Sequence, residues 1–142
     1  MRISKLLSAL LVAVLGTVAM SAQAQVVVII SSKNPISKLT PDMVSQIFLG
    51  QAKTFYNGGQ AEPVDQAEGA ALRAEFYEKA MGKSPAQLKA YWSKMTFSGK
   101  AQPPQALADS KAVVKRVAEN PKYIGYVDKS AVDATVKVVL TF

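Results

Sequence analysis

The sequence predicts an α/β domain in which a mixed, mostly parallel sheet is flanked by helices. Apolar, β-branched runs that are typical of buried strands alternate with segments whose apolar residues recur at helical spacing. Removing a 24-residue export signal from 142 residues leaves 118. That length is enough for one domain with a real core but not for two. We therefore expect a single domain over residues 25–142.

Residues 1–24 have the features of a signal peptide. Arg2 and Lys5 form a positive first region, residues 6–20 are mostly apolar, and Ala22-Gln23-Ala24 is a small-x-small cleavage site. The apolar stretch is shorter than the roughly 20 residues that span a bilayer, so we favour cleavage over a membrane anchor. We expect a periplasmic protein that has no membrane span after cleavage.

The first part of the predicted domain contains a buried strand, a capped helix and a weak strand. Residues 26–31 (VVVIIS) form a continuous apolar run, as expected of a strand covered on both faces. Thr40 is a predicted N-cap, with Pro41 at the first helical position and Gly50 just beyond the end. The buried stripe of this helix is Met43, Val44, Ile47 and Phe48. Residues 61–66 (AEPVDQ) are a short strand at best, because their proline favours an edge position.

The segment VDQAEGAALRAEF, residues 64–76, admits two interpretations. A turn that leads into a helix N-terminus favours an anion, because the first N–H groups lack partners and the helix dipole is positive there. Asp65 and Glu68 also have capping-box spacing, which would start a helix at Gln66 and neutralise its positive end. A further anion would then meet two like charges, each costing on the order of 1 to 4 kcal/mol. From the residues alone we favour the self-capped helix.

Two further elements are predicted between residues 72 and 105. Gly82 ends the helix that carries Leu72, Phe76 and Ala80 on its inner face. Ser84 and Gln87 then form a capping box around a proline and start another helix. The inner face of this helix is Leu88, Tyr91, Trp92 and Met95. Residues 96–105 (TFSGKAQPPQ) are predicted to be loop.

The C-terminal part is predicted to contain one helix and two strands. Ser110 is the expected cap of a helix that Asn120-Pro121 stops. Its inward residues are Val113, Val114, Val117 and Ala118. Residues 123–127 (YIGYV) and 135–142 (TVKVVLTF) are predicted strands.

The residue inventory argues against an enzyme. The chain has no His and no Cys, so a serine nucleophile would lack an imidazole base, and thiol nucleophiles and soft metal ligands are missing. Asp65 and Glu68 could in principle hydrolyse a glycoside, but two carboxylates three residues apart at a helix start are more simply caps. We expect no catalytic residue, no metal site and no cofactor.

The charges do not indicate a nucleic-acid partner. Once Arg2 and Lys5 are removed, fifteen basic residues remain against ten acidic ones. Only Arg73 and Arg116 among them are arginines, the side chain suited to bidentate phosphate recognition. The lysines are dispersed, so we interpret them as a solvated surface.

Four segments of the chain form a recognisable set. They are LTPDMVSQIFLGQAKTFYNGG, the VDQ segment with its following Arg and Phe, YW to FSGKAQPP, and YIGYV, and they cover most of residues 26–127. The set resembles the periplasmic phosphate-binding protein of the phosphate ABC transporter, and more closely the short, single-domain relatives of that protein. The resemblance implies one lobe of the periplasmic binding protein-like fold, namely the second lobe of a clamp that closes on an oxyanion.

The expected binding loop departs from the pattern of that family. In the full-length relatives this loop carries an Arg and a Ser-Gly-Thr-like run that bind phosphate. Here Gly69 is kept, no hydroxyl remains in the loop, and Arg73 lies one turn into the helix. The resemblance thus implies the fold more directly than it implies the ligand.

Two hypotheses of function follow. The first is an exported solute-binding protein of the phosphate type, which binds phosphate or another small anion alone or as a homodimer. Its candidate ligand-binding residues are Ser32, Lys33, Glu68, Gly69, Ala70, Arg73 and Lys100. Ser32 is included because ligands of α/β sheets bind beyond the carboxyl ends of strands.

The second hypothesis is a non-transport module, derived from a binding lobe, that docks on an envelope or sensor protein. Its candidate anchors are Tyr56, Tyr91, Trp92 and Phe97. For Tyr91 and Trp92 we favour packing in the core, because both lie on the inner face of a predicted helix.

Overall fold

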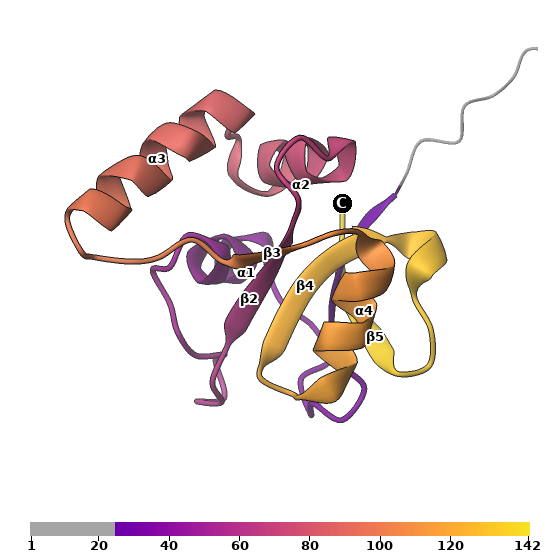
Figure 1. The fold of residues 1–142 in the computed structure, drawn as a ribbon. Helices are drawn as coiled ribbons and strands as arrows, with labels where there is room; N and C mark the ends of the chain where they lie inside the picture. The colour runs from indigo at the N-terminus through magenta and orange to yellow at the C-terminus, as the bar shows by residue number, and fades with distance from the viewer. Residues whose placement is uncertain (1–24) are drawn as a thin grey trace, which may run out of the picture.

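The computed structural model describes residues 25–142, which form one mixed sheet with helices on both faces (Figure 1). The predicted signal peptide, residues 1–24, lies outside the described residues. The sheet has the order β3-β2-β4-β1-β5. Its strands are β1 (Val26–Ser31), β2 (Glu62–Gln66), β3 (Gln105–Leu107), β4 (Tyr123–Asp128) and β5 (Val136–Thr141).

One strand of the sheet runs against the other four. β2 is parallel to both β3 and β4, whereas β1 is antiparallel to β4 and to β5. The sheet is therefore mixed and mostly parallel in direction, which confirms the predicted fold class. As a result, the carboxyl end of β1 lies at the end of the sheet where β2 and β4 begin, opposite their carboxyl ends.

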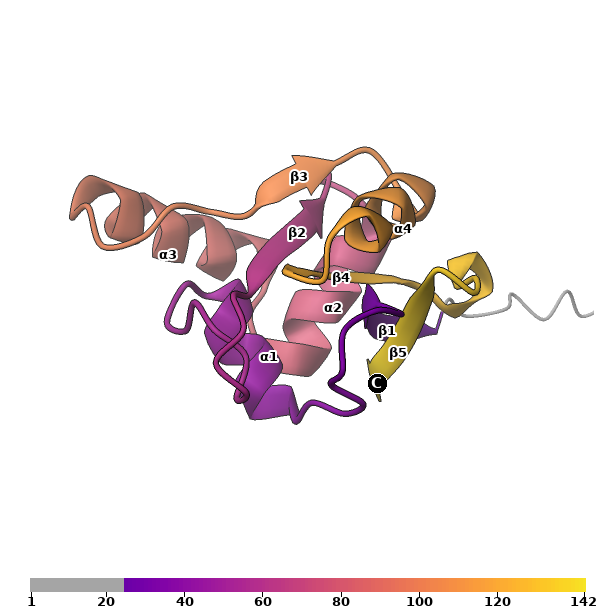
Figure 2. The same cartoon turned by 90° about the horizontal axis from the view of Figure 1, so that it is seen from below.

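The sheet separates two hydrophobic clusters, and successive side chains of β1 point alternately into one cluster and the other. Val26, Val28 and Ile30 pack into the larger cluster with α1 (Pro41–Phe48) and α2 (Ala71–Met81). Val27 and Ile29 pack on the other face with α4 (Ser110–Glu119). A strand buried on both faces explains its unbroken apolar run, and Figure 2 shows the helices on the two sides of the sheet.

α4 approaches β4 closely at Gly125. A Cβ atom placed on this residue would lie 2.5 Å from Cγ1 of Val113 on α4. The glycine is therefore required by packing, since any side chain would push the helix away from the sheet.

α3 (Pro85–Phe97) follows α2 and extends outward at one side of the molecule (Figures 1 and 2), while its residues Leu88 and Trp92 pack into the larger cluster. The predicted capping box at Ser84 and Gln87 is present, and Leu88 and Trp92 are buried as predicted. The hydroxyl of Tyr91 donates to the backbone oxygen of Leu49, at 2.6 Å, which ties α3 to the end of α1.

The predicted caps of α1 and α2 hold at three of four ends. The Thr40 side chain accepts from the N–H of Met43, and Gly50 and Gly82 have positive φ just past the two C-termini. The start of α2 was predicted wrongly. The helix begins at Ala71 rather than Gln66, because residues 62–66 continue as strand β2.

Two further predictions were wrong in detail. β3 lies at the end of a segment predicted to be loop. The cap of α4 is Asp109, whose side chain accepts from the N–H of Ala112. The hydroxyl of Ser110 instead accepts from the Gln66 side chain and from the N–H of Asp128. None of the helices formed by residues 25–142 combines the length and apolar character needed to cross a membrane.

Candidate functional site

Asp65 is a buried carboxylate at the carboxyl end of β2. Only 2% of the residue is exposed. Oδ1 accepts from the N–H of Gln66, at 2.8 Å, and from the hydroxyl of Tyr126. Oδ2 accepts from the hydroxyl of Tyr77, at 2.6 Å. Asp65 is therefore not the N-cap that its spacing from Glu68 suggested, and its charge is directed into the protein.

The two tyrosines reach Asp65 because the aromatic core holds them. Tyr77 lies on α2 and Tyr126 on β4, and the ring of Tyr126 stacks on Phe76 with centroids 3.9 Å apart. Burial, followed by the negative charge of Asp65 and its hydrogen bonds, raises the pKa of both hydroxyls. Both tyrosines therefore remain neutral donors to the carboxylate.

Arg73 balances the charge of Asp65. Its Nε lies 3.5 Å from Oδ1 of Asp65, and 18% of its side chain is exposed. Its guanidinium also lies over the ring of Tyr77, 5.4 Å from the centroid. Arg73 is thus held from the buried side, while its exposed part lines a cleft.

The N-terminus of α2 has no side-chain cap. Its N-cap is Ala70, and no acidic residue occupies the first turn. Gly69 precedes it with φ of 89° and has open space where a Cβ would be. No side chain accepts from the first N–H groups of this 11-residue helix: Asp65 is turned into the protein, and Glu68 stays exposed in the turn.

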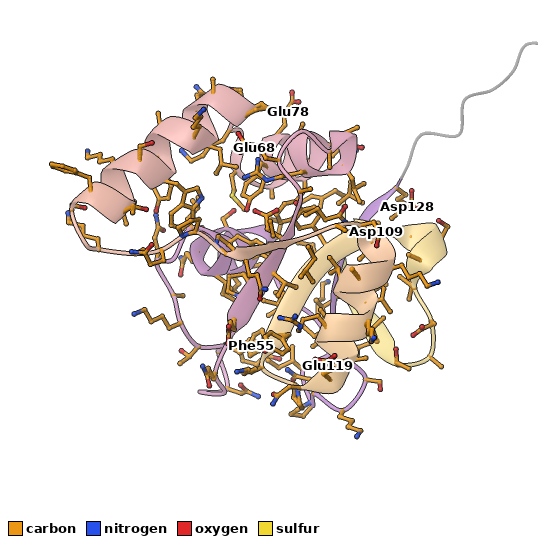
Figure 3. The ribbon with its side chains drawn as sticks, in the orientation of Figure 1. Phe55, Glu68, Glu78, Asp109, Glu119 and Asp128 are labelled. Carbon is orange, nitrogen blue, oxygen red and sulfur yellow. The ribbon has the colours of Figure 1, made fainter. Side chains whose placement is uncertain are left out.

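A cleft of about 510 Å³ lies between this turn and α3. Figure 3 shows Glu68 between α2 and the N-terminal half of α3. The cleft is lined by residues of the turn, of α2 and α3, and of the loop after α3: Glu68, Arg73, Pro85, Lys89, Trp92, Ser93, Thr96, Phe97 and Pro103. Lys89 and Arg73 are thus set against Glu68 in the cleft and Asp65 buried behind Arg73, and Ser93 and Thr96 add two hydroxyls.

Trp92 lines both this cleft and the groove next to it, and its indole N–H is buried. Its residue is 7% exposed, and within the described residues its indole N–H forms no hydrogen bond. A buried donor without a partner is costly, so the indole N–H is a candidate for contact with a bound molecule or water.

The structure brings together only part of the predicted site. Glu68 and Arg73 line the cleft, whereas Gly69 and Ala70 lie between them in the chain, at the turn before α2, and are not part of its lining. Ser32 and Lys33 do not join them. They follow β1, which is antiparallel to β4, so they lie at the opposite end of the strands from Asp65. The expectation that Ser32 lies at the carboxyl ends of the other strands was therefore wrong, because β1 runs in the opposite direction.

Lys100 also lies away from Arg73. It lines an adjoining groove of about 500 Å³ together with Gln60 and Glu62, near the start of β2, and this groove shares Trp92 and Pro103 with the cleft. In contrast, Lys89, Ser93 and Thr96 line the cleft but were not chosen as candidate ligands. Their spacing on α3 is i, i+4 and i+7, which places them on one helical face and could have indicated a polar wall.

The known proteins that this chain matches are solved structures. No model of a known protein family matches the sequence, and neither does any curated protein. A protein from Clostridium perfringens, assigned as a phosphate ABC transporter substrate-binding protein and solved with bound phosphate, matches with a TM-score of 0.66 and 21% identity. An ABC-type phosphate transport receptor from Vibrio cholerae gives 0.63 and 17%, and PstS from Borrelia burgdorferi gives 0.58 and 12%.

These matches concern one part of longer proteins. They cover 82% of this chain but 44%, 45% and 46% of the three matched chains. The chain thus spans less than half the length of the structures it matches. At such identities the likeness establishes the fold, and the single-lobe architecture implied by the sequence resemblance is confirmed.

Proposed function

We propose that this chain is an exported binding protein that holds phosphate, or a similar small oxyanion, in the cleft between the β2–α2 turn and α3. The observation that carries the proposal is the uncapped N-terminus of α2 beside an arginine that a buried carboxylate holds in place. The matched structures support it, since they are phosphate-transport proteins by description and one contains phosphate.

Three kinds of donor would bind the anion. The first N–H groups of α2 present a positive helix end, Arg73 supplies a partly exposed guanidinium, and Lys89 adds an exposed cation from α3. Glu68 opposes them from an exposed position, where solvent screens its charge.

We propose binding rather than catalysis, and a periplasmic location. Hydrogen bonds and charges at this cleft are arranged to hold a ligand, and the predicted signal peptide would export the domain. The second hypothesis, docking on another protein, is favoured by one feature. Phe97 and Tyr56 are 96% and 62% exposed, so both remain available as anchors, whereas Tyr91 and Trp92 pack against α1 and the core.

Calorimetric titration of the purified protein with phosphate at low salt tests the proposal. Arg73→Ala should weaken phosphate binding by about 10-fold or more, because a hydrogen bond to a charged group contributes about 1.5 to 3 kcal/mol. Arg116→Ala is the matched control. Arg116 lies on α4, where it bonds Gln105 and Glu119, and it does not line the cleft.

The outcome that contradicts the proposal is specific. If the parent protein does not bind phosphate, or if the two substitutions weaken phosphate binding equally, the cleft is not the anion site. Loss of phosphate binding together with capture of a defined envelope protein would favour the docking hypothesis instead.

A further inference from the structure

The segment over residues 79–108, which includes α3, has only positive charges. It contains five lysines, no arginine and no carboxylate. Lys89, Lys94 and Lys100 are exposed, and among the described residues none of the three forms an ion pair. These charges are therefore unpaired within the domain, and they favour an anionic partner.

An apolar ring lies among these lysines at the end of α3. Phe97 is the last residue of α3 and is 96% exposed, the largest exposed fraction of any large apolar residue in the described part of the chain. It follows Lys94 by three residues and precedes Lys100 by three. Figures 1 and 2 show the end of α3 and the loop after it at the outer side of the molecule, where a large partner can reach them.

α3 is held in the molecule by its opposite side. Leu88 and Trp92 pack into the larger cluster, and the Tyr91 hydroxyl bonds the backbone oxygen of Leu49. Phe97 follows Leu88 by nine residues, which at about 100° per residue places it on the other side of the helix. The ring therefore lies outside the core, and a partner that covers it gains the free energy of removing it from water.

The residue types favour an anionic lipid surface over an acidic protein. Protein interfaces are enriched in Arg and depleted in Lys, because the planar guanidinium pairs bidentately with carboxylates. Lysines without arginine, next to an exposed aromatic ring, are more typical of a contact with anionic headgroups. The apolar side of α3 is packed in the core, so the helix cannot lie flat on a bilayer, and its end alone would make the contact.

We propose that the end of α3 and the loop after it form a peripheral contact with a membrane surface that carries anionic phospholipids. Phe97 enters the headgroup layer, and Lys94 and Lys100 bind lipid phosphates on either side of it. The predicted export would bring the domain next to the membranes of the cell envelope. The contact does not use Arg73 or Lys89, which are the cations of the anion cleft.

Co-sedimentation with lipid vesicles at low salt tests the proposal. The protein to use is residues 25–142, which form the described domain, because an uncleaved signal peptide would itself bind lipid. Vesicles that mix phosphatidylglycerol with phosphatidylcholine should bind this domain. Vesicles of phosphatidylcholine alone should bind it about 10-fold less tightly or worse, and added salt should weaken the binding to the anionic vesicles.

Two variants remove the proposed contact. Phe97→Ala should weaken binding to the anionic vesicles by about 10-fold or more, because the ring no longer leaves water. Lys94→Gln combined with Lys100→Gln should weaken it by a similar factor, since each lysine near an anionic surface contributes about 5-fold. All three side chains are exposed, so these variants should fold as the parent protein does.

Each variant has a matched control. Tyr56→Ala removes an exposed ring next to α1, away from the end of α3. Lys111→Gln combined with Lys115→Gln removes the same charge from α4, on the other face of the sheet. Both controls should bind the anionic vesicles as the parent protein does, and controls that lose as much binding as the α3 variants overturn the proposal.

The remaining outcomes separate this inference from the proposed function. Absence of binding to the anionic vesicles, or equal binding to both kinds of vesicle, overturns the inference, and absence favours the docking of Phe97 on an acidic protein. Arg73→Ala should bind vesicles normally. If it does not, the lipid phosphate binds in the cleft, which overturns the inference and supports the proposed function. Normal vesicle binding by a protein that does not bind inorganic phosphate supports the inference and overturns the proposed function.

Discussion

At the scale of single residues, the burial of Asp65 removes one of two carboxylates from the turn before α2, where Glu68 remains exposed. An exposed carboxylate at the start of α2 would repel an anion, whereas the Asp65 carboxylate accepts hydrogen bonds from two tyrosines and is paired with Arg73. The same pairing orients Arg73 toward the cleft. Asp65 is thus a positioning residue, and it acts on a ligand only through the arginine.

Replacing Asp65 with Asn tests this pairing. The substitution keeps the shape but leaves Arg73 without its buried counter-charge, and we expect a loss of about 3 kcal/mol in the free energy of unfolding. Urea unfolding at neutral pH measures it. Glu68→Gln is the matched control, because Glu68 is exposed and its loss should change stability by less than about 0.5 kcal/mol. Equal effects of the two substitutions would contradict the assigned role of Asp65.

The buried tyrosines predict a pH dependence. Because burial and Asp65 raise the pKa of Tyr77 and Tyr126 in the folded protein, the unfolded chain releases these protons first, near its ordinary pKa of about 10. Their contribution to stability is fully present below about pH 10 and is lost as the pH rises above it. The slope for each tyrosine is up to about 1.4 kcal/mol per pH unit.

Urea unfolding in steps from about pH 9 to about pH 11 measures this loss. Tyr77→Phe should make the decline with pH shallower, because one of the two groups no longer titrates. An unchanged slope in that variant would show that Tyr77 ionises as readily in the folded protein as in the unfolded chain.

At the scale of elements, close packing of α4 on β4 leads to a further prediction. Gly125→Ala places a methyl group within 2.5 Å of a branched Val113 side chain that cannot swing away freely. We expect a loss of about 1 to 3 kcal/mol in the free energy of unfolding, as is typical of overpacked cores. Denaturant unfolding measures it, and a loss below about 0.5 kcal/mol would mean that α4 can shift at little cost.

The elements that the sequence predicted well are those whose signals are local. Thr40, Gly50, Gly82 and the Ser84 capping box act within a few residues of the chain, so their roles could be recognised without tertiary information. The errors arose where contacts with residues far away in the sequence determine the local structure. Asp65 has the spacing of a cap, but a tyrosine 61 positions away takes its side chain into the core.

The site was predicted in part for the same reason. Gly69 and Arg73 lie near each other in the sequence, so they were found together. Ser32 lies away from these two residues because of the direction of β1. That direction follows from the pairing of β1 with β4 rather than from any local pattern. β3 escaped prediction because its three residues form a strand only by pairing with β2.

At the scale of the whole molecule, the fold combines a rigid sheet with a helix that stands off its edge. The cleft is lined by Glu68 of the β2–α2 turn, by Arg73 of α2 and by α3, so the proposed anion site depends on how α3 is held against α2. A ligand bound there would connect α2 to α3, and a protein that gains such a connection gains stability with ligand concentration.

Thermal unfolding at low salt, titrated with phosphate and separately with sulfate, tests the central claim most directly. Phosphate at about 100 times its Kd should add about 2.7 kcal/mol of stability, a rise of several degrees in Tm for a domain of this size. Arg73→Lys, which keeps the charge but loses the planar fork, should reduce that rise. A Tm that does not respond to phosphate, or responds equally in the parent protein and the variant, would contradict an anion site at Arg73.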